Sequence, residues 1–435
     1  MKKIGIFTTF ASYSEAYSLN RVVCDQIKML VNGGYTPVVI VGSTFQPTKA
    51  YALPEVEIRH IPDVPVSNSV EKDITFDQDV LQIEKALEIA LEGVDVVLTH
   101  DVIYQPAALK HNIAARRVAK RNSNILWLHW IHSATSPYVL TKERTEFKDE
   151  YINLVNESFP NSFYICFNDY SKHRVSQNFK VEMDKVKVIH HPTDIFELYK
   201  FEEKSIDFTL KHNLLQSDII CVYPIRLDRG KQVEKVAWTI GMMKRHFGRT
   251  VRLIVFDFHS TGQEKIDYRN YIKEEAKEAG LVVGEEIIFA SEEYPEWRVE
   301  VPHEIISDMF RLSNVFIMAS SSESYSLITQ EAGLMGVASM INFDFPPFID
   351  IFGYSPYWGK FSSNINVMYA EDGDTTTTVN NKDEFYKSLA GKLIYEVDNN
   401  RAIVLRDNLR KYRNHNYVFK YELENLLYYK NDGLK

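Results

Sequence analysis

Cysteine, glycine and proline are scarce in this chain of 435 residues, which contains 3, 18 and 15 of them, respectively. So little glycine and proline excludes a collagen-like or low-complexity chain. The cysteines, Cys24, Cys166 and Cys221, are odd in number, far apart and embedded in apolar segments. This pattern does not fit a disulfide framework or a metal site, so we expect buried thiols in a reducing compartment.

Long apolar runs are also missing, since none approaches the length of a membrane-spanning helix. Lys2 and Lys3 precede a short apolar run, as in a secretory signal, but polar residues and Glu15 soon interrupt it. A first β-strand is therefore the better interpretation of this segment. We expect a protein of the cytoplasm with no transmembrane segment.

The chain has no excess of basic residues either. Its net charge is −9, and its composition is 45% hydrophobic and 25% charged, which is typical of a globular protein with substantial cores. The acidic balance does not favour nucleic acid as a partner. No spacing typical of metal ligands is visible, so we expect no metal and no obligate cofactor.

Short apolar segments alternate with helical segments along most of the chain. In the first half the expected strands are 3–7, 36–41, 94–99, 125–131, 163–167 and 186–189, and the expected helices are 19–31, 82–91 and 107–120. In the second half the expected strands are 219–223, 251–256, 286–289 and 315–319, and the expected helices are 233–247, 266–279, 303–312 and 382–396. Such alternation predicts an α/β fold with mostly parallel sheets covered on both faces.

Residues 190–213 interrupt this alternation, because they begin as a loop and continue as a charged segment without a clear core face. We therefore predict two Rossmann-like, doubly wound domains, 1–196 and 197–401, that face each other across a cleft. A final helix within the segment 402–435 is long enough to return to the first domain. Ligands of such folds bind at the carboxyl ends of the strands, so we expect a site between the two domains.

The most informative stretch is 314–338, which has the pattern of a strand, a polar turn and a helix. The candidate core contacts of the helix are Leu327, Ile328, Ala332, Leu334 and Met335, and Gly336 is a plausible end. Unpaired N–H groups at the helix start favour an anion in the turn. Glu323 in this turn suits sugar hydroxyl groups and would repel a bare phosphate, and Glu331 follows in the helix. The stretch therefore predicts a ligand that is part phosphate and part polyol.

A second element, 219–231, is a strand that ends at Arg226, with Lys231 five residues later and a helix after it. Two cations at a strand end that faces a helix start can hold a diphosphate as its charge grows on departure. Arg229 is a third cation in the same turn. A basic turn on the surface is the alternative interpretation.

The sequence SSESYSLITQEA, residues 321–332, resembles the Glu-x7-Glu segment of the retaining nucleotide-sugar glycosyltransferases with the GT-B fold, above all glycosyltransferase family 4. The resemblance implies that Glu323 contacts the donor sugar and Glu331 the ribose of the nucleotide. It also implies that Arg226 and Lys231 hold the diphosphate and that the turn residues Ser324, Tyr325, Ser326 and Leu327 lie close to it. Two surface carboxylates at a helix start are the alternative interpretation.

The first half must supply the acceptor site. The resemblance implies a histidine near the anomeric carbon and the acceptor, at the end of the strand 125–131. His132, just past this strand, is our candidate, and His129 within the strand is the competitor, although histidines at strand ends are often structural. His100 and Asp101 end another strand and are candidate acceptor contacts, or simply part of a capped turn.

Two further features have open interpretations. Lys110, Arg117 and Arg121 form a basic stripe on one helix, which is either a solvated face or a docking site for an anionic acceptor or a membrane surface. The run 341–359 is rich in proline and aromatic residues and could line an acceptor site, form an oligomer interface or pack as a loop. The turn after the first strand, 8–18, contains no glycine where the family usually has one.

Together these patterns and the resemblance imply a retaining hexosyltransferase. It would move a glucose- or mannose-type sugar from a UDP- or GDP-sugar to a hydroxyl group of an acceptor such as a sugar, glycan or lipid. The resemblance implies front-side displacement without an obligate metal or protein nucleophile, and domain closure would exclude water. The alternatives are a disaccharide phosphorylase, a sugar-nucleotide epimerase, a nucleic-acid-modifying glycosyltransferase or a non-catalytic nucleotide-sugar-binding protein. The sequence leaves the donor base, the acceptor and the oligomeric state open.

Overall fold

The computed structural model divides into two compact units. The first comprises Met1–Asp194 with Tyr412–Lys435, and the second comprises Ile195–Lys411. The structure describes residues 2–64, 74–133, 135, 139, 148–321, 323, 325–343, 345, 347–353, 356–359, 361 and 382–429.

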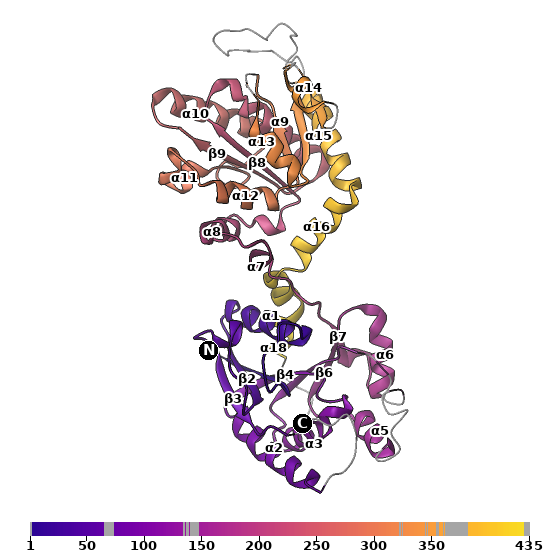
Figure 1. The fold of residues 1–435 in the computed structure, drawn as a ribbon. Helices are drawn as coiled ribbons and strands as arrows, with labels where there is room; N and C mark the ends of the chain where they lie inside the picture. Colours follow the sequence, from indigo (N-terminus) through magenta and orange to yellow (C-terminus); the bar gives the residue numbers. More distant parts are fainter. Residues whose placement is uncertain are drawn as a thin grey trace. The chain divides into compact units, whose positions relative to one another are not determined.

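The first unit contains a seven-stranded sheet with the order β3-β2-β1-β4-β5-β6-β7, in which all strand pairs are parallel. Its strands are β1 (Lys3–Phe7), β2 (Thr36–Gly42), β3 (Glu57–Ile61), β4 (Val94–His100), β5 (Leu126–Trp130), β6 (Ser162–Cys166) and β7 (Val186–Val188). Its helices are α1 (Ser18–Asn32), α2 (Phe76–Ala90), α3 (Leu109–Arg121), α5 (Lys148–Asn156), α6 (Asp169–Phe179), α17 (His415–Val418) and α18 (Glu424–Leu427). Figure 1 shows these elements in indigo to magenta, with α17 and α18 at the yellow end of the chain.

Both faces of this first sheet are buried, because successive side chains of a strand point to opposite faces. Ile4 and Ile6 of β1 pack in the core that α1 covers together with Val418 and Leu423 near the C-terminus. Phe7 packs in the opposite core, which α2 and α3 cover. Strands that are buried on both faces are continuous apolar runs, which is why the sequence identified most of them.

The second unit contains a six-stranded sheet with the order β10-β9-β8-β11-β12-β13, again with parallel pairs (Figure 1). Its strands are β8 (Ile219–Arg226), β9 (Val251–Phe258), β10 (Ile287–Phe289), β11 (Val315–Met318), β12 (Ala338–Asn342) and β13 (Tyr357–Gly359). Its helices are α7 (Ile195–Tyr199), α8 (Glu203–Lys211), α9 (Val233–Phe247), α10 (Gln263–Glu278), α11 (Ala290–Glu293), α12 (His303–Leu312), α13 (Leu327–Leu334), α14 (Pro347–Phe352), α15 (Lys382–Asn399) and α16 (Arg401–Tyr412). Two parallel, doubly wound sheets confirm the predicted fold class of each unit.

Each sheet has a point where the strand order reverses. In the first unit this point lies between β1 and β4, and in the second between β8 and β11. The strands on the two sides of such a switch point send their following loops in opposite directions, which opens a crevice at their carboxyl ends. The candidate residues at the ends of β4, β8 and β11 are therefore at the positions where ligands bind in folds of this class.

Some predicted elements differ from the structure. The segment 201–213 was predicted to lack a clear core face. It contains α8, and Phe208 on this helix is fully buried. The predicted final helix is not continuous, because α16 ends at Tyr412 and Asn414 caps a new helix by accepting a 2.9 Å hydrogen bond from the N–H of Tyr417. Two predicted core contacts of α13 are wrong, as Leu327 is 67% and Leu334 is 87% exposed. Their exposure follows from the shortness of α13, which buries only one narrow side.

The predicted fate of the cysteines is correct for two of the three. Cys166 and Cys221 are buried, whereas Cys24 on α1 is partly exposed, and none of the three is bound in a disulfide. Burial raises the pKa of the Cys221 thiol to about 12, which makes it unreactive at neutral pH. No helix in the described part of the chain is long and apolar enough to cross a membrane.

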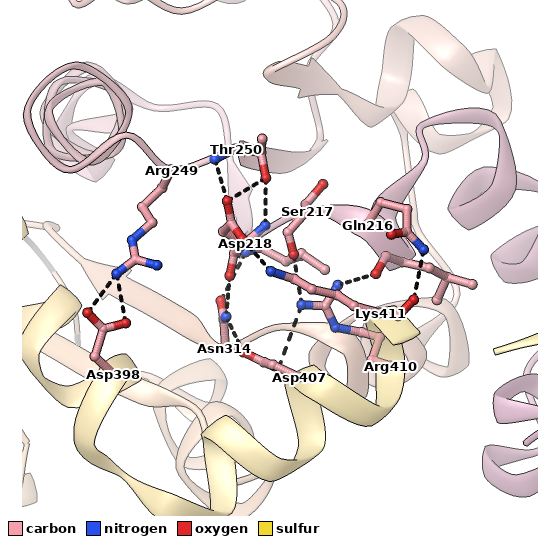
Figure 2. A network of polar contacts seen from close by, with 12 residues as sticks. Gln216, Ser217, Asp218, Arg249, Thr250, Asn314, Asp398, Asp407, Arg410 and Lys411 are labelled. Atoms are coloured by element: carbon pink, nitrogen blue, oxygen red, sulfur yellow. Dashed lines mark hydrogen bonds and ion pairs between the residues drawn. The ribbon is translucent and has the colours of Figure 1, made fainter. Parts of the chain in front are cut away.

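A network of polar contacts fastens α16 to the amino-terminal ends of β8, β9 and β11 (Figure 2). Asn314, which precedes β11, donates to Asp407 of α16 over 2.6 Å and to the carbonyl of Asp218 over 2.7 Å. Arg410 donates to the carbonyls of Leu214, Leu215 and Ser217. These contacts lie at the end of the sheet opposite the predicted ligand crevice, so Asn314 has a structural role.

Candidate functional site

The ends of β8 and β11 carry the two loops that the sequence singled out. β8 and β11 are adjacent, with Val315 paired to Cys221. The N–H of Ser321, after β11, donates to the carbonyl of Gly230, after β8, over 2.9 Å, and the hydroxyl of Ser320 donates to the same carbonyl over 3.2 Å. The two loops are therefore tied together by hydrogen bonds at the switch point of the second sheet.

Lys231 and Glu323 form an ion pair across these loops, through Nζ and Oε1. Their side chains are only 12% and 19% exposed, respectively, so the pair is partly shielded from water. Tyr223 of β8 donates from its hydroxyl to the carbonyl of Lys231 over 2.7 Å, which fixes the backbone that carries the lysine. The structure thus brings together a cation and a carboxylate that the sequence assigned to phosphate and sugar.

Arg226 and Arg229 have different environments in the same loop. The Arg226 side chain is 61% exposed, with Nε 3.6 Å from the carboxylate of Asp228, which also pairs with Lys265. The guanidinium of Arg229 lies over the rings of Tyr268 and Tyr271, at 5.3 and 5.6 Å from their centres. Arg229 is therefore occupied by cation–π contacts, whereas Arg226 extends into solvent where it can meet a ligand.

The start of α13 is formed by Ser326, which has a left-handed backbone conformation with φ 76° and ψ 73°. Its hydroxyl lies 2.8 Å from that of Thr329, and no side chain caps the helix among the described residues. Leu327 and Tyr325 are exposed beside it. The N–H of Thr329 donates to the carbonyl of Ser326 over 3.2 Å, and the N–H groups at the start of a helix point toward an anion that binds there. Ser324 lies outside the described residues.

Glu331 is on the second turn of α13, and its Oε1 lies 3.2 Å from Nε2 of His303 on α12. The carboxylate is partly exposed, and it lies on the same helix that begins at the predicted diphosphate position. His303 was not predicted from the sequence. The structure places it on the helix before β11, where it can orient the carboxylate of Glu331.

The first unit brings three histidines together at its own switch point. His100, the last residue of β4, has its Nδ1 2.9 Å from Nε2 of His132, which follows β5. The ring of His191, which follows β7, stacks on His132 with centres 5.4 Å apart and planes at 8°. Phe167 stacks in turn on His191, with centres 4.0 Å apart. The structure therefore joins two of the predicted residues, His100 and His132, to one that was not predicted.

Burial keeps these imidazoles neutral. It lowers the pKa of His132 to about 3, with a smaller effect from His191, and holds the pKa of His100 well below its usual value. The pKa of His191 is also lowered by burial, although Asp25 opposes the shift. Neutral imidazoles act as one donor and one acceptor each, so they suit hydroxyl groups better than they suit anions.

The other two candidates of the first unit have internal partners. His129 has no exposed surface, and its Nδ1 lies 2.8 Å from the hydroxyl of Thr99. A side chain without exposed surface cannot touch a ligand, so the geometry favours His132 over His129. Asp101 has a left-handed φ of 59°, and its carboxylate accepts hydrogen bonds from the hydroxyl of Tyr104 and the N–H of His132. Its contacts hold the loop that carries His132.

The basic stripe on α3 faces the acidic residues of α2. Lys110 contacts Asp79 at 2.6 Å, and Arg117 and Arg121 contact Glu84 at 3.2 and 2.7 Å, respectively. These ion pairs neutralise the positive charge that would attract an anionic acceptor or a membrane surface. The stripe is therefore better explained as a helix–helix contact.

The run 341–359 forms regular structure in its described part. It completes β12, contains α14 with the fully buried Phe348, and ends in β13 at the edge of the sheet. A cavity of about 560 Å³ lies between α13, β12, β13 and α15, and its lining includes Leu334, Ile341, Phe352 and Glu396. The run thus builds the edge of the second unit.

No group of three histidine, cysteine, aspartate or glutamate residues in the described part of the chain is placed to hold a metal ion. The second unit brings together cations, carboxylates and hydroxyl groups, and the first unit brings together neutral imidazoles. Such groups can bind a phosphorylated sugar compound through charge-assisted and neutral hydrogen bonds.

Comparisons with known proteins give similar structures but no family. No family model and no curated protein matches the chain. Among solved structures, the chain is similar to HepE from Anabaena in complex with UDP, at 12% identity over 98% of this chain and 99% of that chain, with a TM-score of 0.35. A glycosyltransferase from Rickettsia africae ESF-5 matches at 14% identity over 98% and 96%, with a TM-score of 0.34. Sucrose-phosphate synthase from Thermosynechococcus elongatus matches at 14% identity over 96% of each chain, with a TM-score of 0.36. The assignment of function therefore depends on the residues of the two units.

Proposed function

We propose that this protein is a retaining glycosyltransferase that moves a hexose from a UDP- or GDP-sugar to an acceptor hydroxyl group. The observation that carries the proposal is the junction of two loops at the switch point of the second sheet. It combines Lys231 with Glu323 beside the start of α13, which has no side-chain cap among the described residues. Cations and helix N–H groups bind phosphate, and a carboxylate binds sugar hydroxyl groups.

The role of each residue follows from its position. Arg226, Lys231 and the first turn of α13 stabilise the diphosphate as the bond to the anomeric carbon breaks and negative charge moves onto the leaving group. Glu323 accepts hydrogen bonds from hydroxyl groups of the donor sugar. Glu331 accepts hydrogen bonds from the ribose. The nucleotide diphosphate leaves on the face from which the acceptor hydroxyl attacks, and an oxygen of the leaving diphosphate takes the proton of that hydroxyl. The configuration of the sugar is therefore retained.

The ion pair between Lys231 and Glu323 is compatible with these roles. A lysine ammonium group has three N–H donors, so it can keep one bond to Glu323 and direct another to a phosphate oxygen. The carboxylate in turn has several lone-pair positions and can accept from sugar hydroxyl groups at the same time. The pair then holds the sugar and the diphosphate in a fixed relation, which contributes to catalysis by orientation.

For the first unit we propose the acceptor side of the reaction. His132 would contact the donor sugar and the acceptor hydroxyl group, and His100 and Asp101 would hold it in place. A nucleotide-sugar-binding protein without turnover is the second candidate, favoured by the ion pair that Lys231 and Glu323 form with each other. Such a protein would bind the donor but release no nucleotide when acceptors are added.

The test begins with a thermal-shift screen of the intact protein against UDP-, GDP- and ADP-sugars, each well above its dissociation constant. A binding donor should raise Tm by several degrees. Lys231→Met and Glu331→Ala should each weaken the response to that donor, whereas Glu304→Ala, an exposed carboxylate on α12, should leave it unchanged.

Transfer is then measured as acceptor-dependent release of the nucleotide diphosphate. Release that requires an acceptor supports the transferase, and binding without release across a broad acceptor panel supports the non-catalytic protein. If no nucleotide sugar stabilises the protein, or if the wild type and Glu331→Ala respond identically, the proposed donor site is wrong.

A further inference from the structure

The switch point of the first unit contains a chain of hydrogen bonds that begins on a helix far from it in sequence. Gln26 is buried on α1, and its Oε1 lies 2.8 Å from Nε2 of His100. Nδ1 of His100 lies 2.9 Å from Nε2 of His132. The three side chains come from α1, from the end of β4 and from the segment after β5, so the fold has assembled them from separate elements.

The direction of each bond in this chain is determined by the first member. The amide oxygen of Gln26 is an acceptor only, so Nε2 of His100 must carry a proton and donate it. A neutral imidazole carries one proton, so Nδ1 of His100 is bare and accepts a hydrogen bond. The proton in that bond must belong to Nε2 of His132, and this leaves Nδ1 of His132 bare.

The direction of these hydrogen bonds requires that the imidazoles of His100 and His132 are both neutral, and both are. His100 is almost fully buried, and its surroundings hold its pKa well below the usual value. His132 is partly buried, and burial lowers its pKa to about 3. Two protonated rings at this separation would also repel each other. Each ring therefore has a single proton near neutral pH.

We propose that Gln26 is a positioning residue that, through His100, holds His132 in the tautomer with a protonated Nε2 and a bare Nδ1. The bare Nδ1 is an acceptor for a hydroxyl group of the sugar or of the acceptor substrate. The backbone N–H of His132 donates to the carboxylate of Asp101 over 3.1 Å, and the imidazole ring of His132 stacks on that of His191. The backbone and the ring plane of His132 are therefore fixed as well. The catalytic part of this inference rests on the proposed function, and the tautomer does not.

The tautomer is measured by nitrogen-15 NMR of the intact protein labelled at histidine, because bare and protonated imidazole nitrogens have well-separated shifts. The His132 signals are assigned by their loss in His132→Gln. In the wild type we expect Nδ1 of His132 to be bare and Nε2 to be protonated. A protonated Nδ1 or a rapidly exchanging mixture in the wild type would overturn the proposal without the need for any further variant.

The variant Gln26→Met then removes the amide acceptor while it keeps the length of the side chain. A buried N–H without a partner is unfavourable, so the protons of His100 and His132 should shift to their Nδ1 atoms. We expect the His132 spectrum to change accordingly, and kcat to fall by about 10- to 100-fold with a smaller change in KM for the donor. An unchanged spectrum, or a changed spectrum with full kcat, would contradict the role of Gln26.

Asn20→Leu is the matched control, because Asn20 is a buried amide on the same helix that contacts Tyr51 instead of a histidine. It should leave the His132 spectrum and kcat unchanged. A wild type that transfers no sugar from any donor would refute the proposed function, whereas the tautomer of His132 would still be decided by its own nitrogen shifts. The two failures can thus be told apart.

Discussion

Lys231 and Glu323 are 92 positions apart in the sequence and form an ion pair at the carboxyl ends of two adjacent strands. In the absence of a ligand, the pair makes the centre of the proposed donor site electrically neutral. Removal of the Lys231 charge therefore lowers the local charge by one unit, and removal of the Glu323 charge raises it by one unit. The affinities for nucleotide diphosphate and for nucleotide sugar should respond differently to this change in charge, because only the nucleotide sugar carries the donor sugar whose hydroxyl groups Glu323 would bind.

Glu323→Gln separates these contributions. The substitution removes a negative charge next to the diphosphate, so UDP or GDP alone should bind as tightly as to the wild type, or more tightly. The complete nucleotide sugar should bind about tenfold more weakly relative to the diphosphate, because charge-assisted bonds to its hydroxyl groups are lost. Calorimetric titration of both ligands measures the ratio. Equal effects on the two ligands would mean that Glu323 does not contact the sugar.

The contacts of α16 give a prediction about stability. Arg410 is buried, donates to three carbonyl groups and lies 3.7 Å from Asp407. Arg410→Leu leaves these carbonyls and the Asp407 carboxylate without that partner. We expect a loss of about 3–5 kcal/mol in the free energy of unfolding. For a unit of this size, this corresponds to a fall in Tm of roughly 6–20 °C.

Calorimetry of the intact protein measures this shift, with Arg401→Leu as the control on the same helix. Arg401 is exposed at the start of α16, so its substitution should change Tm by little. Equal shifts for the two variants would show that the network in Figure 2 does not stabilise the second unit. A large shift for Arg410→Leu alone would confirm that the network does.

The sequence predicted the fold because the central strands are buried on both faces. β1, β8 and β11 are apolar runs, and α9 and α12 begin and end at the predicted residues. β3 escaped prediction because it lies at the edge of its sheet and has the mixed sequence EIRHI, with only Ile61 buried. Edge strands face solvent in part, so their composition resembles that of loops.

The candidate site was predictable only where its residues are neighbours in the sequence. Glu323 and Glu331 share one strand–turn–helix segment, so a motif could reveal them. Gln26 and His191 contact His100 and His132 because the fold places their elements side by side. No local sequence pattern connects residues so far apart in the chain. A polar residue on the buried side of α1 is the only signal for Gln26 that the sequence contains.

The exposed leucines of α13 give a second prediction about stability. Leu327 and Leu334 were predicted to be core residues and are mostly exposed, whereas Ala332 is fully buried between them. Leu327→Gln and Leu334→Gln should therefore each change the free energy of unfolding by less than about 0.5 kcal/mol. Ala332→Gln should destabilise by about 1–3 kcal/mol, because it forces a larger polar side chain into a packed core. Urea titration compares the three variants, and a large effect of Leu334→Gln would show that the residue is covered in the intact protein.

The stability of the protein should depend on pH through the buried His129. His129 has no exposed surface, and burial together with Arg116 holds its pKa well below the usual 6.5. Below pH 6.5 the unfolded chain binds a proton at His129 and the folded protein does not. The free energy of unfolding must therefore decrease as the pH falls below 6.5, and the contribution of His129 is fully present above that pH.

A single histidine of this kind contributes a slope of up to about 1.4 kcal/mol per pH unit once the unfolded form is fully protonated. His129→Leu removes the proton uptake at this position. Between pH 6.5 and 4.5, the slope of the free energy of unfolding against pH should therefore be smaller for this variant, by up to the contribution of one proton. His173→Gln, a substitution of an exposed histidine on α6, is the control and should keep the slope of the wild type. Urea titrations at a series of pH values give the slopes directly. If His129→Leu retains the full slope, the proton uptake on unfolding comes from other groups, and the neutral, buried state of His129 does not limit stability in acid.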